Sequence, residues 1–301
     1  MTPPGTQAES PRWSMLFALL PLPAILLGAY VTSRSGTSAK AFAVNGAAVV
    51  LGTAMTVAVG RLSDATLRRV SVVAVLLTAS TLLFTGLDGV RRWMELGPVR
   101  LHASSVFAPW VLVAISASLH RRFALSVVLA LAMSAIHVAQ PDAGQGTAFA
   151  LAAVTLLARA RSIPWPRRAL GCAGVLALGL AAWFRVDPLH AVPHVERIVH
   201  LAAAQGPVLG ALAVLSLALL FVPSVWTATR APTSDAPGAM LSVSLAVYLA
   251  VTVLVTELGN FPVPVLGAGA GAVLGWYAMT GMLVASWRHS SHREASHLGA
   301  T

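Results

Sequence analysis

The stretch Leu87-Asp88-Gly89-Val90-Arg91-Arg92-Trp93-Met94-Glu95-Leu96-Gly97-Pro98 lies between two long apolar runs. Apolar runs of about 20 residues are typical of membrane spans, so we expect this stretch to be a short loop at a membrane surface. One interpretation is an interfacial anchor, because arginine and tryptophan commonly lie at the level of the lipid headgroups. That interpretation explains the tryptophan and one arginine. It does not explain an adjacent basic pair on the outer side, where basic residues are normally depleted.

The composition of the chain indicates an integral membrane protein. Of its 301 residues, 57% are hydrophobic and 10% are charged, and the mean hydropathy is +0.78. Soluble domains carry about 25% charged residues. A bilayer offers the peptide backbone no hydrogen-bond partners, so apolar spans fold as helices. The sequence therefore predicts an all-α polytopic membrane protein.

We expect about ten transmembrane helices, with eight as the lower bound, in a single domain of residues 14–287. Residues 1–13 and 288–301 are predicted to be cytoplasmic tails, and the second tail is expected to be disordered. Gly206-Pro207 is expected to break the eighth span, because proline removes a helical hydrogen bond, and to leave 194–205 as an outer half-helix. The expected spans are 14–32, 41–60, 70–87, 104–120, 123–139, 146–158, 169–184, 198–222, 238–257 and 266–287.

The distribution of charge gives an orientation and argues against nucleic acid as a partner. The net charge is +10, but the basic residues are scattered between the spans and are not gathered on one face. With both termini in the cytoplasm, 13 of the 20 basic residues lie inside, as the positive-inside rule requires. The outer side then holds six acids in short loops, which predicts a functional site there. These acids are Asp88, Glu95, Asp142, Asp187, Glu196 and Glu257.

The opening stretch resembles the SEDS family (shape, elongation, division and sporulation), whose members include FtsW, RodA and SpoVE. The family pattern is roughly N-G-A-R-R-W-I-x-L-G-P, followed by F-Q-P-S-E-x-A-K. His102 and Ala103 replace the Gln-Pro of the pattern, and Ser105 and Ala108 replace its Glu and Lys. The residues that match are Gly89, Arg91, Arg92, Trp93, Leu96, Gly97, Pro98 and Ser104.

Three further segments resemble the same family, and all four occur in the family's order. Gln140-Pro141-Asp142-Ala143-Gly144 is similar to Q-P-D-x-G, and Phe261-Pro262-Val263-Pro264 is similar to I-P-L-P. Aligning Gly210-Ala211 with a family G-A places His194 and Glu196 on the His and Asp of A-H-T-D. The outer loop before that segment is shorter here than in the family.

The resemblance implies a SEDS-like helical bundle in the bacterial cytoplasmic membrane. It implies a peptidoglycan glycosyltransferase that polymerises lipid II at the outer face, in cell division or the control of cell shape. The implied partners are lipid II or a related undecaprenyl-pyrophosphate-linked sugar, membrane lipid, and a class B penicillin-binding protein that cross-links the strands.

That reaction predicts a role for each charged residue at the outer side. A glycosyltransferase needs cations for the leaving pyrophosphate and a carboxylate that accepts the hydroxyl proton. Arg91 and Arg92 suit the first role, because arginine binds phosphate in a bidentate fork. Glu196, at the start of a helix, is the predicted catalytic base. The other predicted substrate-binding residues are Asp142, Asp187, His194 and His200.

Other interpretations of Glu196 and of the whole protein stay open. Glu196 could be an ordinary acid at a helix start, paired with Arg197 or His200. His190, His194, Glu196 and His200 could bind a divalent cation, but their spacing fits no sharp zinc motif, so no dedicated metal site is predicted. The protein could also be a non-catalytic scaffold of a wall-synthesis complex, or a transporter of lipid-linked precursors.

Overall fold

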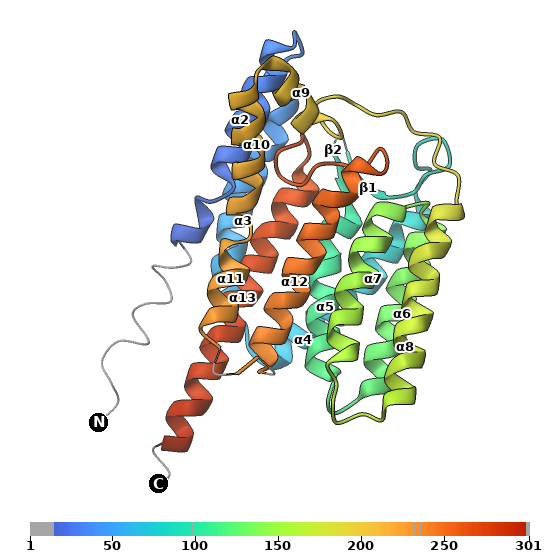
Figure 1. The fold of residues 1–301 in the computed structure, drawn as a ribbon, viewed down its shortest axis with the longest axis vertical. Helices are drawn as coiled ribbons and strands as arrows, with labels where there is room; N and C mark the ends of the chain where they lie inside the picture. The colour runs from blue at the N-terminus through green and yellow to red at the C-terminus, as the bar shows by residue number, and fades with distance from the viewer. Residues whose placement is uncertain (1–14, 98, 232, 235, 299–301) are drawn as a thin grey trace.

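The computed structural model describes residues 15–97, 99–231, 233–234 and 236–298, so the predicted tail 1–13 lies outside the described residues. The chain forms an upright bundle of helices (Figure 1). The α-helices are α2 (Leu22–Arg34), α3 (Ala43–Gly60), α4 (Asp64–Ala79), α5 (Ala103–Ser118), α6 (Phe123–Ala139), α7 (Ala143–Ala158), α8 (Trp165–Ala181), α9 (Ile198–Gln205), α10 (Pro207–Leu219), α11 (Val222–Thr229), α12 (Pro237–Leu254) and α13 (Ala270–Leu298). Short 3-10 helices are η1 (Ala39–Phe42), η2 (Ser80–Leu83), η3 (Ala182–Phe184) and η4 (Val255–Glu257).

The expected all-α polytopic membrane fold is confirmed. Each of the ten expected spans overlaps a helix or a run of consecutive helices, with bounds that differ by several residues at some ends. By length and composition, five helical segments of the described chain are able to cross a membrane, or six if the bent pair α10 and α11 is one span. The helices α5, α6 and α7 are apolar but have only 16 or 17 residues. The fifth and sixth expected spans are the separate helices α6 and α7.

The loop that leads to α5 contains a β-hairpin, which was not expected from the sequence. Strands β1 (Trp93–Leu96) and β2 (Val99–His102) pair antiparallel, and Trp93 lies opposite His102. Gly97 at the turn has φ +61°, a conformation that glycine adopts without strain. The hairpin lies at the same end of the bundle as α9 (Figure 1).

Two helix boundaries follow from the local sequence. Gly206 has φ +150° and separates α9 from α10, so the expected break before Pro207 is confirmed. At the other end of the chain, α13 continues to Leu298 through most of the stretch expected to be a disordered tail. No glycine or proline interrupts residues 287–298, so nothing in that sequence stops the helix.

The helix α13 lies inside the bundle and packs against α3 and α5. Small residues allow these close contacts: a Cβ added at Gly52 would lie 2.3 Å from the Tyr277 ring, and one at Gly275 would lie 1.9 Å from the Ser105 carbonyl oxygen. Close backbone approach of this kind is typical of helix packing in membranes. The Tyr277 hydroxyl also donates to the Ala18 carbonyl at 2.7 Å.

At each end of the bundle, a polar side chain forms hydrogen bonds with the backbone of another element. At the end where α3 terminates, Arg288 of α13 donates to the Gly60 carbonyl at 2.5 Å. At the opposite end, the buried side chain of Asn45 donates to the Gly267 carbonyl at 3.0 Å and accepts from the Gly269 N–H at 2.7 Å. Asn45 thereby fixes the loop before α13 at the same end as the hairpin (Figure 1).

We predict that Gly275→Ala lowers the melting temperature of the purified protein, because the new Cβ forces α5 and α13 apart. Overpacking of this kind costs about 1–3 kcal/mol. Gly46→Ala in α3 is the matched control, since a Cβ there meets no atom within 4 Å. Thermal unfolding in detergent measures both, and equal effects of the two substitutions would contradict the packing argument.

Candidate functional site at the hairpin end

A buried arginine joins three loops at the hairpin end of the bundle. Arg92, at the base of the hairpin, is only 2% exposed. Its Nε and Nη2 donate to the Pro141 carbonyl at 3.1 and 2.5 Å, and Nη2 also forms an ion pair with Asp187. The site therefore brings together the hairpin, the turn between α6 and α7, and the loop after α8.

The carboxylate of Asp142 lies beside this arginine and is almost fully buried. Its Oδ1 caps α7 by accepting from the Gln145 N–H at 3.2 Å, and its Oδ2 lies 3.3 Å from Nε2 of His102. Burial by itself would raise the pKa of Asp142, but the charge of Arg92 and the contact with His102 hold that pKa below its ordinary value. Asp142 is therefore ionised and compensates the buried positive charge.

The two adjacent arginines, expected from the sequence to act as a pair, have different surroundings. Arg91 is exposed and makes one hydrogen bond, from Nη1 to the Leu82 carbonyl at 3.2 Å. Arg92 is buried, and the bonds described above engage its Nε and Nη2. Asp187, the partner of Arg92, also accepts from the Leu189 N–H at 3.2 Å. Of these two arginines, Arg91 is the one that presents a guanidinium to a ligand arriving from outside the bundle.

Glu196 lies in the turn that precedes α9 and is partly buried. Its Oε2 accepts from the Val192 N–H at 2.6 Å. Burial raises the pKa of Glu196 above its ordinary value, although this hydrogen bond and the charges of Arg92 and Arg197 act in the opposite direction. A carboxyl group with a raised pKa holds its proton up to a higher pH, which suits a group that accepts and releases protons.

The segment around Glu196 is held against the loop before α13 by two backbone hydrogen bonds. The Val263 N–H donates to the Val195 carbonyl and the Ala268 N–H donates to the His194 carbonyl, both at 3.0 Å. A Cβ at Gly267 would lie 2.5 Å from the Val195 carbonyl oxygen, so glycine is required for this approach. Two of the four family-like segments, far apart in the chain, therefore lie side by side.

The neighbours of Glu196 make their contacts elsewhere. Arg197 donates to the Thr256 carbonyl at 3.1 Å and to Oδ1 of Asn260 at 3.0 Å. His200 lies 3.2 Å from Glu257 in an exposed pair. These contacts do not match the alternative in which Glu196 is merely the partner of Arg197 or His200.

The described residues at this end form no cluster of ligands for a divalent cation. Among the described residues, no three side chains of His, Cys, Asp or Glu gather closely enough to hold a metal ion. The alternative set His190, His194, Glu196 and His200 is therefore not assembled as a site.

Two polar residues at this end, His102 and Gln140, were not singled out as site residues from the sequence. Gln140 is fully buried, donates to the Thr78 carbonyl and the Thr81 hydroxyl, and accepts from the Ser104 hydroxyl at 3.2 Å. Both residues fall within family-like segments, and this position is the feature of the sequence that could have identified them as site residues. Their partners are distant in sequence, so the contacts themselves could not be inferred.

Comparison with solved structures identifies the architecture. Rod shape determining protein RodA of Thermus thermophilus superposes with a TM-score of 0.63 at 21% identity, covering 91% of this chain and 96% of that chain. A point mutant of the same RodA superposes with a TM-score of 0.64 at 20% identity, covering 91% and 97%. A chain from a structure of a peptidoglycan synthase complex that coordinates polymerization and crosslinking superposes with the same values as the mutant.

At the level of sequence, no family model and no curated protein matches the chain. Identity of 20–21% to the solved structures is low, but the superposition extends over nine-tenths of the chain. The helices α2 to α13 thus form a bundle of the RodA type. The chain therefore has a SEDS-like fold.

Proposed function

We propose that this protein is a SEDS-like peptidoglycan glycosyltransferase that polymerises lipid II at the outer face of the bacterial cytoplasmic membrane. The observation that carries the proposal is the superposition on RodA over 91% of the chain. In this proposal both termini are cytoplasmic, and the hairpin end of the bundle faces outward. The context is cell division or the control of cell shape.

Glu196 is the proposed catalytic base. Polymerisation requires a group that removes the proton from the attacking sugar hydroxyl, and a carboxylate with a raised pKa suits that role near neutral pH. The bond from Val192 orients the carboxylate, and the loop before α13 fixes the turn that carries it. Both constraints reduce the cost of placing the base against a substrate.

The remaining charged residues are proposed to bind the lipid-linked pyrophosphate and sugars. Arg91 offers an exposed guanidinium for the pyrophosphate, which arginine binds in a bidentate fork. Arg92 contributes positive charge from within, and its bonds to Pro141 and Asp187 hold together the loops that are proposed to bind the substrate. The sugar contacts are assigned to Asp142, Asp187, His194 and His200.

The proposed partner is a class B penicillin-binding protein that cross-links the new strands. One of the superposed structures is of a peptidoglycan synthase complex that coordinates polymerization with crosslinking, and that description concerns the protein in that structure. A polymerase that releases glycan at the membrane surface needs a cross-linking enzyme nearby. We therefore propose the same kind of partnership for this chain.

A non-catalytic scaffold of a wall-synthesis complex is the second candidate. Ser105 and Ala108 stand where the family pattern has Glu and Lys, and the bonds of Arg92 are made within the protein. Both features are compatible with a fold that is kept for binding and not for chemistry. A polymerisation assay separates the two candidates.

We predict that the purified protein, with its transpeptidase partner present, converts lipid II into glycan strands and that Glu196→Ala does not. Loss of a general base costs about 10²–10⁴-fold in rate. Gel analysis of labelled glycan measures the product. Glu95→Ala is the matched control, because Glu95 pairs with Arg100 in the hairpin and has no proposed catalytic role.

Each outcome of this assay selects one interpretation. Product from wild type and Glu95→Ala but not from Glu196→Ala supports a polymerase with Glu196 as the base. Equal product from all three proteins keeps the polymerase and removes Glu196 from its chemistry. Absence of product from folded wild type with its partner favours the scaffold.

We predict that the two neighbouring arginines have separable effects. Arg92→Ala leaves Asp142 and Asp187 without their buried counter-charge, and breaking a buried pair costs about 3–5 kcal/mol. Arg91→Ala changes stability by less than about 0.5 kcal/mol, as is usual at a surface, but raises the KM for lipid II. Thermal unfolding and polymerisation kinetics measure both; equal destabilisation by the two substitutions would refute this assignment.

Glu196 should reveal its raised pKa in a measurement that does not depend on catalysis. Because the folded-state pKa is raised, ionisation opposes folding, and wild type loses this part of its stability as the pH rises through that pKa. Glu196→Gln removes the titration and should have the higher melting temperature at pH 8. The two proteins should converge near pH 4, about the ordinary pKa of a glutamate. A difference that is independent of pH would contradict the shift.

A further inference from the structure

Three polar side chains that the proposed polymerase does not use together lie next to one another where α5 and α7 begin. The Oγ atom of Ser105 lies 3.0 Å from Nδ1 of His102, and Nε2 of His102 lies 3.3 Å from Oδ2 of Asp142. Asp142 is 1% exposed and His102 is 8% exposed, so the carboxylate and the imidazole are shielded from water. This order of hydroxyl, imidazole and carboxylate is that of an activated serine.

The backbone of α5 decides which nitrogen of His102 carries the proton. His102 caps α5, and Nδ1 accepts the Ser105 N–H at 3.4 Å. Nδ1 therefore has its lone pair directed to Ser105, and the N–H of the neutral ring is at Nε2, 3.3 Å from Oδ2 of Asp142, a buried oxygen that accepts no other hydrogen bond from the described residues. In this tautomer Nδ1 is a base for the Ser105 hydroxyl, and Asp142 stabilises the imidazolium that forms.

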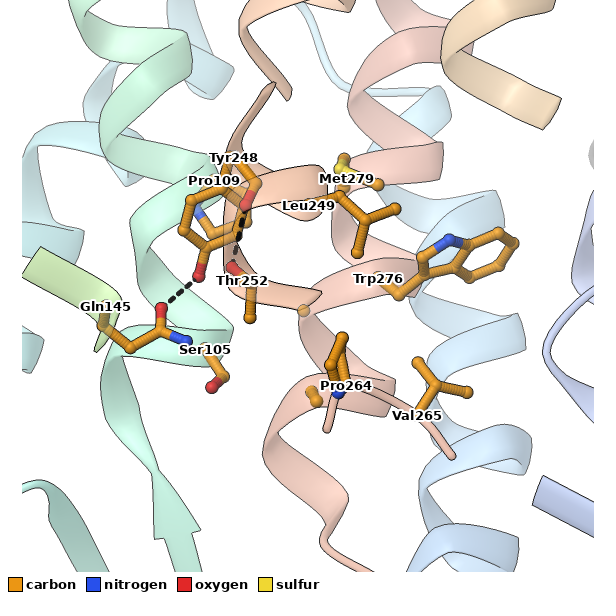
Figure 2. Close-up of a pocket in the computed structure, with 12 residues that line it drawn as sticks. Ser105, Pro109, Gln145, Tyr248, Leu249, Thr252, Pro264, Val265, Trp276 and Met279 are labelled. Atoms are coloured by element: carbon orange, nitrogen blue, oxygen red, sulfur yellow. Dashed lines mark hydrogen bonds between the residues drawn. The ribbon is translucent and has the colours of Figure 1, made fainter. Parts of the chain in front are cut away.

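A side-chain amide stands on the other side of Ser105. The Tyr248 hydroxyl donates to Oε1 of Gln145 at 2.5 Å, which fixes the amide with its nitrogen toward Ser105 (Figure 2). Gln145 also donates its backbone N–H to Asp142, so the first turn of α7 supplies both the carboxylate and the amide. An amide N–H beside an activated serine is a donor for a developing oxyanion.

Ser105 opens into a small pocket beneath the loop before α13. The pocket has a volume of about 30 Å³, and its wall opposite Ser105 is apolar, formed by Leu249, Pro264, Val265, Trp276 and Met279 (Figure 2). No charged side chain lines it among the described residues. Such a wall fits a short, uncharged acyl group and disfavours an ionic one.

We propose that Ser105, His102 and Asp142, with Gln145 as oxyanion donor, form an esterase site for neutral esters that carry a short acyl group. The site shares Asp142 with the proposed sugar contacts but does not include the proposed base Glu196, and the inference does not depend on polymerase activity. Ser105 stands where the family pattern has a glutamate, so the arrangement of Ser105, His102 and Asp142 is not part of that pattern.

The proposed reaction balances with water as the second substrate. Oγ of Ser105 bonds to the ester carbonyl carbon while its proton passes to Nδ1 of His102, and the carbonyl oxygen becomes an oxyanion facing Nε2 of Gln145. The bond to the leaving alkoxide then breaks, and His102 returns the proton to it as the alcohol departs. Water attacks the acyl group by the same route, releasing the carboxylic acid and restoring Ser105.

The test uses an alkyl fluorophosphonate, which reacts covalently with activated serines, on the full-length protein in detergent. We expect wild type to form an adduct that mass spectrometry of peptides assigns to Ser105, and to hydrolyse p-nitrophenyl acetate, whose acetyl methyl suits a pocket of about 30 Å³. Ser105→Ala should lose both the adduct and the hydrolysis. Ser104→Ala is the matched control and should retain both, because the Ser104 hydroxyl is bonded to Gln140 and faces no base.

His102→Gln tests the activation itself. It should slow adduct formation by on the order of 10²-fold, since a general base contributes about 10²–10⁴-fold. Folding of each variant is checked by its elution volume and melting temperature. The proposal is overturned if folded wild type forms no adduct at Ser105, if Ser105→Ala hydrolyses the ester as fast as wild type, or if folded His102→Gln is labelled at the wild-type rate.

Discussion

The buried guanidinium of Arg92 is the interaction on which the organisation of the hairpin end depends. It lies 2% exposed between the Pro141 carbonyl, Asp187 and the neighbouring carboxylate of Asp142. A buried cation is tolerated only with hydrogen bonds and counter-charges around it, so the three loops that supply these groups are held in one arrangement. The cluster therefore has a structural role, because it fixes the loops on which any chemistry at this end takes place.

A second constraint is applied from α3 and the loop before α13. Asn45 fixes residues 265–269, and that loop in turn bonds the turn carrying His194 and Glu196. The result places a partly buried carboxylate with a raised pKa at the same end as the arginine junction. Keeping an acid in such a place opposes folding at neutral pH, and this is compatible with our proposal that Glu196 is the base.

Much of the fold could be predicted from the sequence, because hydrophobic length and the requirement for satisfied backbone groups leave helices as the only spanning elements. The break at Gly206-Pro207 followed from local geometry in the same way. Gly97-Pro98 is a turn signal in the sequence, but the hairpin of residues 93–102 was missed because its pairing lies within a loop whose sequence does not alternate clearly. The extent of α13 was missed because a polar composition was taken as disorder, although composition does not prevent a helix from continuing.

The sequence by itself determined that the chain is a polytopic helical membrane protein with charged loops at one end, and the order of four short segments indicated a SEDS-like fold. Only the tertiary structure decided which of the two adjacent arginines is buried, that His102 lies between Ser105 and Asp142, and that the turn carrying Glu196 is held by the distant loop before α13. The physical reason is that periodicity and composition report on burial along one element at a time. Ion pairs and hydrogen bonds between loops form only where several helices end at the same position along the bundle axis. The local sequence of one helix does not determine where the other helices end.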